Sequence, residues 1–183
     1  MDELLIGPID LVARVDDALA VQALAFGLND EEIHIRRQIV LRHAAYRGTR
    51  AFGAFTADGA LVGFTYGMPN DRAHWWSTVI EPYLVAVGHE DWLDDVFGVT
   101  ELHVLPGFQG HGLGRALITR LTDGVEQSRS ILSAIEGPSR ARRLYHSLGY
   151  VDLARSVRFP SAPSLYVVMG AHLPLPRTGS AER

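Results

Sequence analysis

Three glycines stand at alternate positions in the short segment Gln109-Gly110-His111-Gly112-Leu113-Gly114. The segment Val99 to Leu105 before it predicts a strand, and the periodic run after it predicts a helix. A glycine-rich turn between a strand and a helix directs several backbone N–H groups and the positive end of the helix dipole at one point. A side chain there would hold a ligand away from the amides. The segment therefore predicts an anion site, most simply for a pyrophosphate.

Two familiar phosphate loops do not match this segment. A Walker loop requires a lysine after its last glycine, whereas Arg115 follows Gly114. A dinucleotide fingerprint requires a further glycine where Arg115 stands, and an acidic ribose ligand about 20 residues later. The chain there reads Ile131-Leu132-Ser133. A dinucleotide-binding enzyme is therefore the weakest alternative.

Glu101 and His103 alternate with Leu102 and Val104 along the strand before the glycine turn. Successive side chains of a strand point to opposite faces, so Glu101 and His103 share one face. A carboxylate or an imidazole, directly or through water, can accept a proton as a general base. Glu101 is our first candidate for this base and His103 the second, and the alternative is that Glu101 is a solvated strand residue.

Two blocks of the chain together resemble the GNAT superfamily of acyl-CoA-dependent N-acetyltransferases. The first runs from Glu101-Leu102-His103-Val104-Leu105-Pro106 through the glycine turn to Gly114-Arg115-Ala116-Leu117, and contains the pattern Q/R-x-x-G-x-G/A. The second, Ala141-Arg142-Arg143-Leu144-Tyr145-His146-Ser147-Leu148-Gly149-Tyr150, is similar to the family segment A-x-x-L-Y-x-x-x-G-[FY]. Both stand in family order and at family spacing, over roughly Val99 to Tyr150.

The resemblance implies how acetyl-CoA would be held. Backbone groups of Leu102, His103 and Val104 would pair with the pantetheine arm, and the segment Gln109, Gly110, His111, Gly112, Leu113 and Gly114 would cradle the pyrophosphate. Arg115, or an arginine among Arg140, Arg142 and Arg143, would meet the adenosine 3'-phosphate. Pro138 stands where many relatives carry an asparagine, so a contact through that amide is not expected.

The resemblance also implies an acid. Transfer from a thioester to an amine expels a thiolate, and a phenol with an ordinary pKa of about 10 can donate a proton to it. By position this phenol would be Tyr145. The alternative is that Tyr145 is a core residue on a helix face shared with Ala141, Leu144 and Leu148.

The expected elements place these residues in one α/β domain. We expect the GNAT fold over residues 1–173, with a central mixed, mostly antiparallel sheet flanked by helices, and a loose tail over residues 174–183. The strands are expected at Leu4 to Ile6, Ala51 to Thr56, Leu61 to Gly67, Val99 to Leu105, Ser130 to Ile135, Tyr150 to Val157 and Leu165 to Leu173. The helices are expected at Ala13 to Phe26, from Asn29 or Asp30 to Tyr46, inside Asn70 to Asp95, from Leu113 along a stripe ending at Val125, and at Ser139 to Leu148.

Aromatic residues are dense in the segment from Asn70 to Asp95. Trp75, Trp76, Tyr83 and Trp92 are expected to pack this segment onto the sheet. The alternative is an acceptor pocket that holds an amine against ring faces, which Phe64 and Tyr66 could join.

Composition excludes several functions. The 183 residues include no cysteine, which excludes disulfides and a thiol nucleophile, and all 17 basic residues are arginine, which excludes lysine chemistry. The net charge of −4 argues against nucleic acid as a partner. The eight histidines form no metal-ligand motif, so no metal is expected. Apolar runs are far shorter than the roughly 18 residues of a membrane span, so we expect a cytoplasmic protein that does not contact membranes.

Together these features predict an N-acetyltransferase that moves an acetyl group from acetyl-CoA to a primary amine of a small molecule or peptide. The transfer would be direct, in a ternary complex, since no cysteine could carry the acyl group. The alternative is a non-catalytic acyl-CoA-binding regulatory module. Homodimers are common in the family, and the two closing strands offer one place for such a contact.

Overall fold

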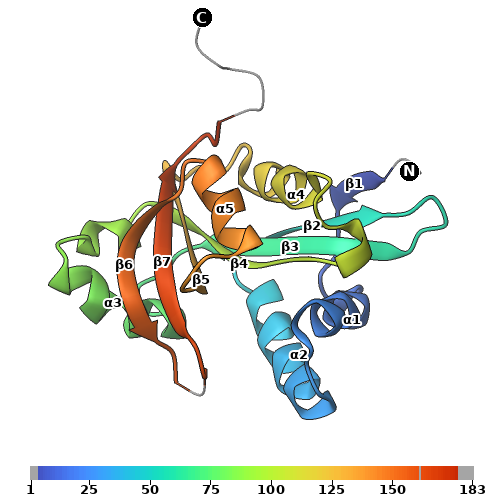
Figure 1. Cartoon of the computed structure of the whole chain (residues 1–183), viewed down its shortest axis with the longest axis horizontal. Helices are drawn as coiled ribbons and strands as arrows, with labels where there is room; N and C mark the ends of the chain where they lie inside the picture. The colour runs from blue at the N-terminus through green and yellow to red at the C-terminus, as the bar shows by residue number, and fades with distance from the viewer. Residues whose placement is uncertain (1–3, 161, 177–183) are drawn as a thin grey trace, which may run out of the picture. The chain divides into compact units, whose positions relative to one another are not determined.

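A computed structural model of the chain describes residues 4–160 and 162–176 (Figure 1). The elements fall into two compact units, which are divided inside strand β4 (Val96–Val104). The first unit comprises the chain up to Met68 and Val99–Leu121, and the second comprises Pro69–Gly98 and the chain from Thr122 on. Hydrogen-bonded strands among the described residues follow the order β1-β2-β3-β4-β5-β7-β6. The pairing of β4 with β5 is parallel and that of β5 with β7 antiparallel, which confirms the expected mixed α/β sheet.

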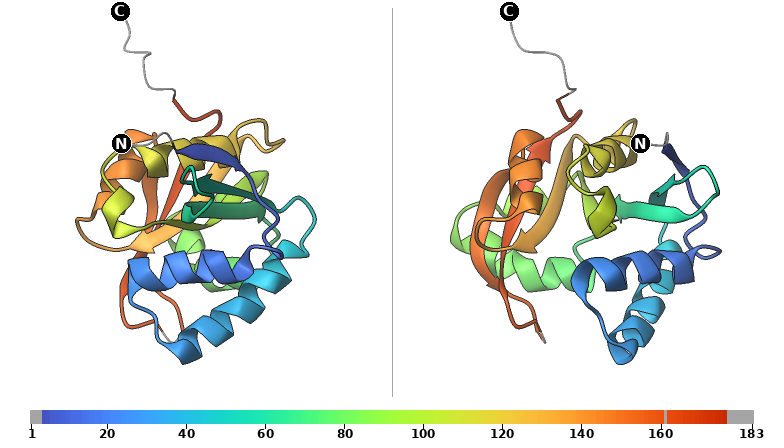
Figure 2. Two further views of the ribbon diagram at one scale, coloured as in Figure 1. Left: turned by 90° about the vertical axis from the view of Figure 1, so that its right-hand side faces the viewer. Right: turned by 45° about the vertical axis from the view of Figure 1, so that its right-hand side comes forward.

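The first unit is a β-sheet with helices on both faces. Its elements are β1 (Leu5–Pro8), α1 (Val15–Phe26), α2 (Asp30–Ala44), β2 (Arg50–Phe55), β3 (Leu61–Pro69), the short 3-10 turn η2 (Pro106–Phe108) and α4 (Leu113–Thr122). Helices α1 and α2 lie on one face of the β1–β3 strands and α4 lies on the other (Figures 1 and 2). The covered faces explain why β3 is buried along nearly its whole length instead of on alternate residues.

Strand β3 contributes side chains to two cores of this unit. Phe64 and Tyr66 pack with Leu19 and Val40 of the α1–α2 layer. Val62 points the other way and packs with Leu117 of α4. A regular strand would place Val62, Phe64 and Tyr66 on one face. The β2–β3 register shifts at this point, because Ala54 pairs with Gly63 and Phe55 with Leu61, and the extra residue Val62 accounts for the change of face.

The helix signals read from the sequence are present at α1 and α2. Gly27 closes α1 in the left-handed conformation, with φ 71°, and its N–H donates to the carbonyl of Ala23. Asn29 begins α2 through a capping box, in which its side chain accepts from the Glu32 N–H and the Glu32 carboxylate accepts from the Asn29 N–H.

The second unit is also a sheet with a helix on each face. Its elements are α3 (Trp75–Ala86), the 3-10 turn η1 (Glu90–Leu93), the start of β4, β5 (Arg129–Ile135), α5 (Arg140–Ser147), β6 (Val151–Arg158) and β7 (Leu165–His172). Helices α3 and α5 lie on opposite faces of the β5-β7-β6 strands (Figure 1). Ile80 and Leu84 of α3 pack against Ile131 and Val168.

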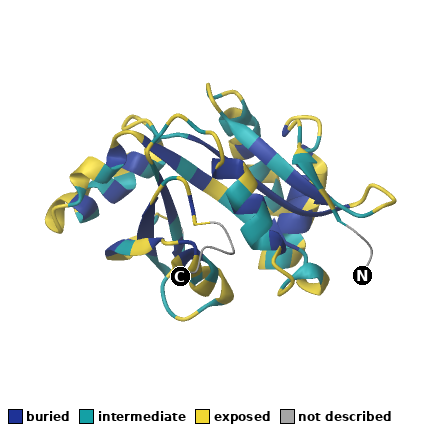
Figure 3. Cartoon of the chain, turned by 90° about the horizontal axis from the view of Figure 1, so that it is seen from above, coloured by how far each residue is buried: buried dark blue, intermediate teal, exposed yellow. Residues whose placement is uncertain are grey.

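Several expected details differ from the structure. Helix α4 ends at Thr122, because Gly124 turns the chain with φ 70°, so Val125 lies beyond the helix. Ala141 is exposed, whereas Tyr145 and Leu148 are buried, so the buried face of α5 is narrower than the apolar pattern suggests. Figure 3 colours the described chain by burial, and buried stretches in dark blue run along its strands. Leu175 is buried within the segment expected to be loose, and residues 177–183 of that segment lie outside the described residues.

Among the described residues, every helix is too short or too polar to cross a lipid bilayer.

Candidate active site

Glu101 and His103 form a directly bonded pair on β4. The Nε2–H of His103 donates to Oε2 of Glu101 at 2.6 Å, which confirms that the two side chains share one strand face. The side chain of Glu101 is 23% exposed and that of His103 5% exposed. Thr65 of β3 donates its hydroxyl to the backbone carbonyl of Glu101 at 2.7 Å, which ties the pair to the neighbouring strand. Glu101 is therefore not the freely solvated strand residue of the alternative interpretation.

Two helices bring further polar groups to Glu101. Arg36 of α2 places Nη1 3.6 Å from Oε1 of Glu101, and the buried Gln22 of α1 hydrogen bonds to the same carboxylate. Burial acts to raise the pKa of Glu101, but the hydrogen bond and charge of His103, with Arg36 and Gln22, more than offset it and hold the pKa below its usual value. The carboxylate is thus ionised at neutral pH.

The sequence interpretation missed Arg36 and Gln22. Gln22 had a usable signal, because it falls on the buried stripe that Val15, Ala18 and Leu19 define on α1. A polar residue on such a stripe requires a buried partner. Arg36 had no such signal, since α2 carries many polar residues and buries only Val40.

Aromatic rings enclose His103. Phe26, at the end of α1, meets its imidazole edge-on with ring centroids 5.2 Å apart, and Phe64 lies 5.5 Å away. Phe26 is 53% exposed, whereas Phe64 and Tyr66 are fully buried. The idea that Phe64 and Tyr66 line an acceptor pocket is therefore wrong, because both rings belong to the core of the first unit.

Tyr66 is part of the polar surroundings of Glu101. Its hydroxyl contacts Nδ1 of His43 at 3.0 Å. Burial and the nearby negative charge of Glu101 raise the pKa of Tyr66 well above its usual value, and the charge of Arg36 opposes this rise. Tyr66 is consequently neutral across the range in which enzymes work.

Two glycines of the glycine turn adopt the left-handed backbone conformation. Gly110 and Gly112 adopt φ of 83° and 82°, where side chains are strained, and a Cβ added at either would meet nothing within 4 Å. Crowding therefore does not explain these glycines, whereas backbone conformation does. Leu113 is buried and anchors the start of α4, where the N–H of Ala116 donates to the carbonyl of Gly112.

Gln109 fastens this turn to β4. Its Nε2 donates to the backbone carbonyl of Val104 at 2.9 Å. His111 and Gly112 are exposed, while Gly114 and Arg115 are partly buried. The first unit therefore contains the Glu101–His103 pair, the strand segment Leu102 to Val104 and the glycine turn, which follow one another along the chain.

Tyr145 lies in the second unit, on α5. It is 8% exposed, and its ring centroid lies 5.8 Å from that of Tyr150 in an edge-on arrangement. The hydroxyls of Tyr150 and Ser130 form a hydrogen bond of 2.7 Å, and burial raises the pKa of Tyr150. Tyr145 is thus buried, as the alternative interpretation predicts.

Arg142 is not available for the adenosine 3'-phosphate. Its Nη2 donates to both carboxylate oxygens of Asp152, at 2.8 and 2.7 Å, and its side chain is 12% exposed. Arg140 and Arg143 are exposed on the same helix, and Arg115 is partly buried in the first unit.

The aromatic residues of the segment before β4 mostly pack. Trp76, Tyr83 and Trp92 are partly buried against the core of the second unit. The guanidinium of Arg129 also lies over the Trp92 ring, 4.8 Å from its centroid. Trp75 differs, with 60% exposure.

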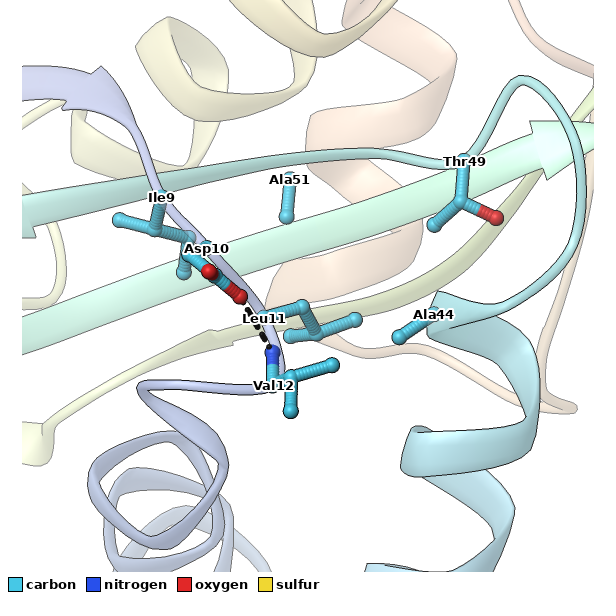
Figure 4. Close-up of a pocket in the computed structure, with 7 residues that line it drawn as sticks. All are labelled: Ile9, Asp10, Leu11, Val12, Ala44, Thr49 and Ala51. Carbon is cyan, nitrogen blue, oxygen red and sulfur yellow. Dashed lines mark hydrogen bonds between the residues drawn. The ribbon is translucent and has the colours of Figure 1, made fainter.

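A small hollow of about 110 Å³ lies in the first unit beside the segment that precedes α1 (Figure 4). It is lined by Ile9, Asp10, Leu11, Val12, Ala44, Thr49 and Ala51. The carboxylate of Asp10 accepts from the Val12 and Ala13 N–H groups, so it serves the local turn. Ligand pockets span roughly 300–1,000 Å³, so this hollow is too small to be the active site.

Comparison with known proteins places the chain in a family. A profile described as Acetyltransferase (GNAT) domain matches residues 49–152. A GCN5-like protein acetyltransferase from Mycobacterium tuberculosis is 32% identical over 197 aligned positions, which cover 92% of this chain and 96% of that protein. The chain belongs to the GNAT family of acetyltransferases.

Solved structures share the GNAT fold at low sequence identity. A GNAT-family acetyltransferase from Desulfovibrio desulfuricans superposes with a TM-score of 0.68 at 16% identity, over 93% of this chain and 99% of that one. PaiA N-acetyltransferase from Thermoplasma acidophilum, solved in complex with coenzyme A, gives a TM-score of 0.61 at 12% identity, over 93% and 99%. These two likenesses concern the fold.

Proposed function

We propose that this GNAT-family chain transfers an acetyl group from acetyl-CoA directly to a primary amine of a small molecule or peptide. The observation that carries the proposal is the glycine turn before α4, in which Gly110 and Gly112 have positive φ and open space where a Cβ would stand. A turn of this kind suits the pyrophosphate of coenzyme A. The coenzyme A complex of the Thermoplasma protein supports the same ligand class.

The residues proposed to hold acetyl-CoA follow from the family pattern. Backbone groups of Leu102, His103 and Val104 would pair with the pantetheine arm, and the turn Gln109 to Gly114 would bind the pyrophosphate. The Gln109 side chain already bonds the Val104 carbonyl, so it would orient the turn relative to the strand. Arg115 is the arginine proposed for the 3'-phosphate, since Arg142 is bound to Asp152.

The proposed chemistry needs one base and one acid. Glu101 would accept the proton of the attacking amine, directly or through water, because its carboxylate is ionised and partly exposed. The amine nitrogen would bond to the thioester carbonyl carbon as the carbon–sulfur bond breaks. Tyr145 would give its proton to the departing thiolate. Holding the two reactants in place can contribute about 7–11 kcal/mol to such a reaction.

The acceptor is proposed to be an amine on a protein or a small molecule. The Mycobacterium relative is named a protein acetyltransferase, so lysine-containing peptides are the first acceptors to test. Amino acids, polyamines and aminoglycosides complete the panel.

The test combines calorimetry with acetyl-CoA and a thiol assay for released coenzyme A. The chain contains no cysteine, so the thiol reagent would read coenzyme A without background from the protein. We expect acetyl-CoA to bind and one class of amine to release free coenzyme A. Binding without release across the panel would favour an acyl-CoA-binding regulatory module, and the absence of binding would overturn the proposal.

A further inference from the structure

The carboxylate of Glu101 is held by two helices that carry none of the proposed catalytic residues. Its Oε2 accepts from His103 on the same strand. Its Oε1 faces the guanidinium of Arg36 on α2, 3.6 Å away, and Gln22 of α1 bonds the same carboxylate. The carboxylate is thus oriented by one group from its own strand and by two groups from outside β4.

Arg36 differs from the other arginine beside it. The Arg37 guanidinium makes an ion pair with Asp16 at 3.0 Å, and the Asp16 side chain is 78% exposed. Exposed pairs of that kind contribute little to stability. Arg36 instead points its charge at a carboxylate that is 23% exposed, where water screens the interaction less. We therefore expect Arg36 to influence the Glu101 carboxylate and Arg37 to have no such effect.

We propose that Arg36 is a positioning residue, which from α2 fixes the orientation of the Glu101 carboxylate and keeps it ionised for proton transfer. The inference rests on the proposed role of Glu101 as base. A carboxylate protonated by its buried setting could not accept a proton, and a permanently charged guanidinium prevents this state.

The groups that face Glu101 come from four elements. His103 lies on β4, Arg36 on α2, Gln22 on α1 and Tyr66 on β3. Gln22 carries no charge, and Tyr66 is neutral because its pKa is raised. Arg36 supplies the permanent positive charge of a guanidinium among these four groups. Loss of Arg36 would raise the pKa of Glu101, because an opposite charge would be removed from a partly buried carboxylate.

The test titrates Glu101 in two independent ways. Carbon-13 NMR of the side-chain carboxyl reports its ionisation, and the acidic limb of the kcat/KM profile reports the base in the free enzyme. In Arg36→Gln we expect both midpoints to move upward by about 1 unit. Arg36→Lys retains a positive charge and should move them less, and Arg37→Gln should leave both where they are in the unmodified protein.

The outcomes separate the inference from the proposed function. An unchanged carboxyl titration in Arg36→Gln would overturn the inference. A shifted carboxyl titration with an unmoved kinetic limb would overturn Glu101 as base, and with it the catalytic part of the inference, while acetyl transfer itself would stand. Should Arg36→Gln fail to fold, Arg36→Met, which also removes the charge, replaces it, and an unchanged carboxyl titration in that variant would overturn the inference.

Discussion

At the scale of single residues, the glycine turn offers the most direct test of acetyl-CoA binding. In Gly112→Val a branched side chain would cover the backbone amides and strain a φ of 82°. Gly59→Val is the matched control, since Gly59 has φ 86° and open space around it in the β2–β3 turn. Left-handed strain costs each variant about 1–2 kcal/mol. We expect only Gly112→Val to lose acetyl-CoA affinity, by more than about tenfold or 1.4 kcal/mol, in calorimetry.

Equal affinity loss in both glycine variants would instead indicate a general effect of destabilisation. Unchanged affinity in Gly112→Val would count against the turn as the pyrophosphate site.

Tyr145 can be tested by removing one oxygen atom. Tyr145→Phe keeps the ring that packs beside Tyr150 and removes the proposed proton donor. General acids contribute about 10²- to 10⁴-fold to rates, so we expect kcat to fall by about 100-fold or more and the acetyl-CoA dissociation constant to stay nearly the same. Tyr83→Phe, on α3, is the control for loss of a tyrosine hydroxyl. Full turnover in Tyr145→Phe would remove the acid assignment.

The ionisation of Glu101 makes the folding stability of the protein depend on pH. The pKa of Glu101 is lowered in the folded chain, so its ionised form contributes stability above the unfolded pKa of about 4.3, and the contribution disappears as pH falls through the folded value. Glu101→Gln should therefore destabilise the protein more at pH 7 than at pH 3. Urea unfolding at both pH values measures the difference, and an equal loss at both would show that the charge is not responsible.

At the scale of elements, a buried hydroxyl pair joins β5 to the residue that precedes β6. Ser130 and Tyr150 are fully buried and bonded at 2.7 Å. Ser130→Ala or Tyr150→Phe alone would leave one buried hydroxyl without this partner, at a cost of about 1–3 kcal/mol. The double variant should be more stable than the two single losses predict when added. Additive losses in chemical denaturation would contradict this pairing.

Element boundaries were predictable where their signals are local. Gly27 ends α1 and Asn29 with Glu32 begins α2, because each signal involves hydrogen bonds within one helical turn. The apolar period predicts an α4 that extends to Val125, but the helix ends at Thr122 and Gly124 has the left-handed conformation. An apolar period alone does not show where a helix stops.

At the scale of the whole molecule, the absence of lysine makes a simple prediction. All 17 basic residues are arginines, which stay protonated and do not act as amine nucleophiles. After incubation of the chain with acetyl-CoA, we expect peptide mapping by mass spectrometry to find no acetylated side-chain amine. Any acetyl group located at an internal peptide would contradict this expectation. A lysine peptide added to the same sample would serve as the positive control.

The sequence by itself determined the family pattern, the strand face of Glu101 and His103 and the glycine turn, because these depend on residue types at fixed short spacing. Tertiary structure decided which partners these residues have. It brought Arg36 and Gln22 to Glu101, buried Phe64 and Tyr66, and bound Arg142 to Asp152. Such contacts form between elements whose packing depends on all their side chains together, so no local pattern in the chain specifies them.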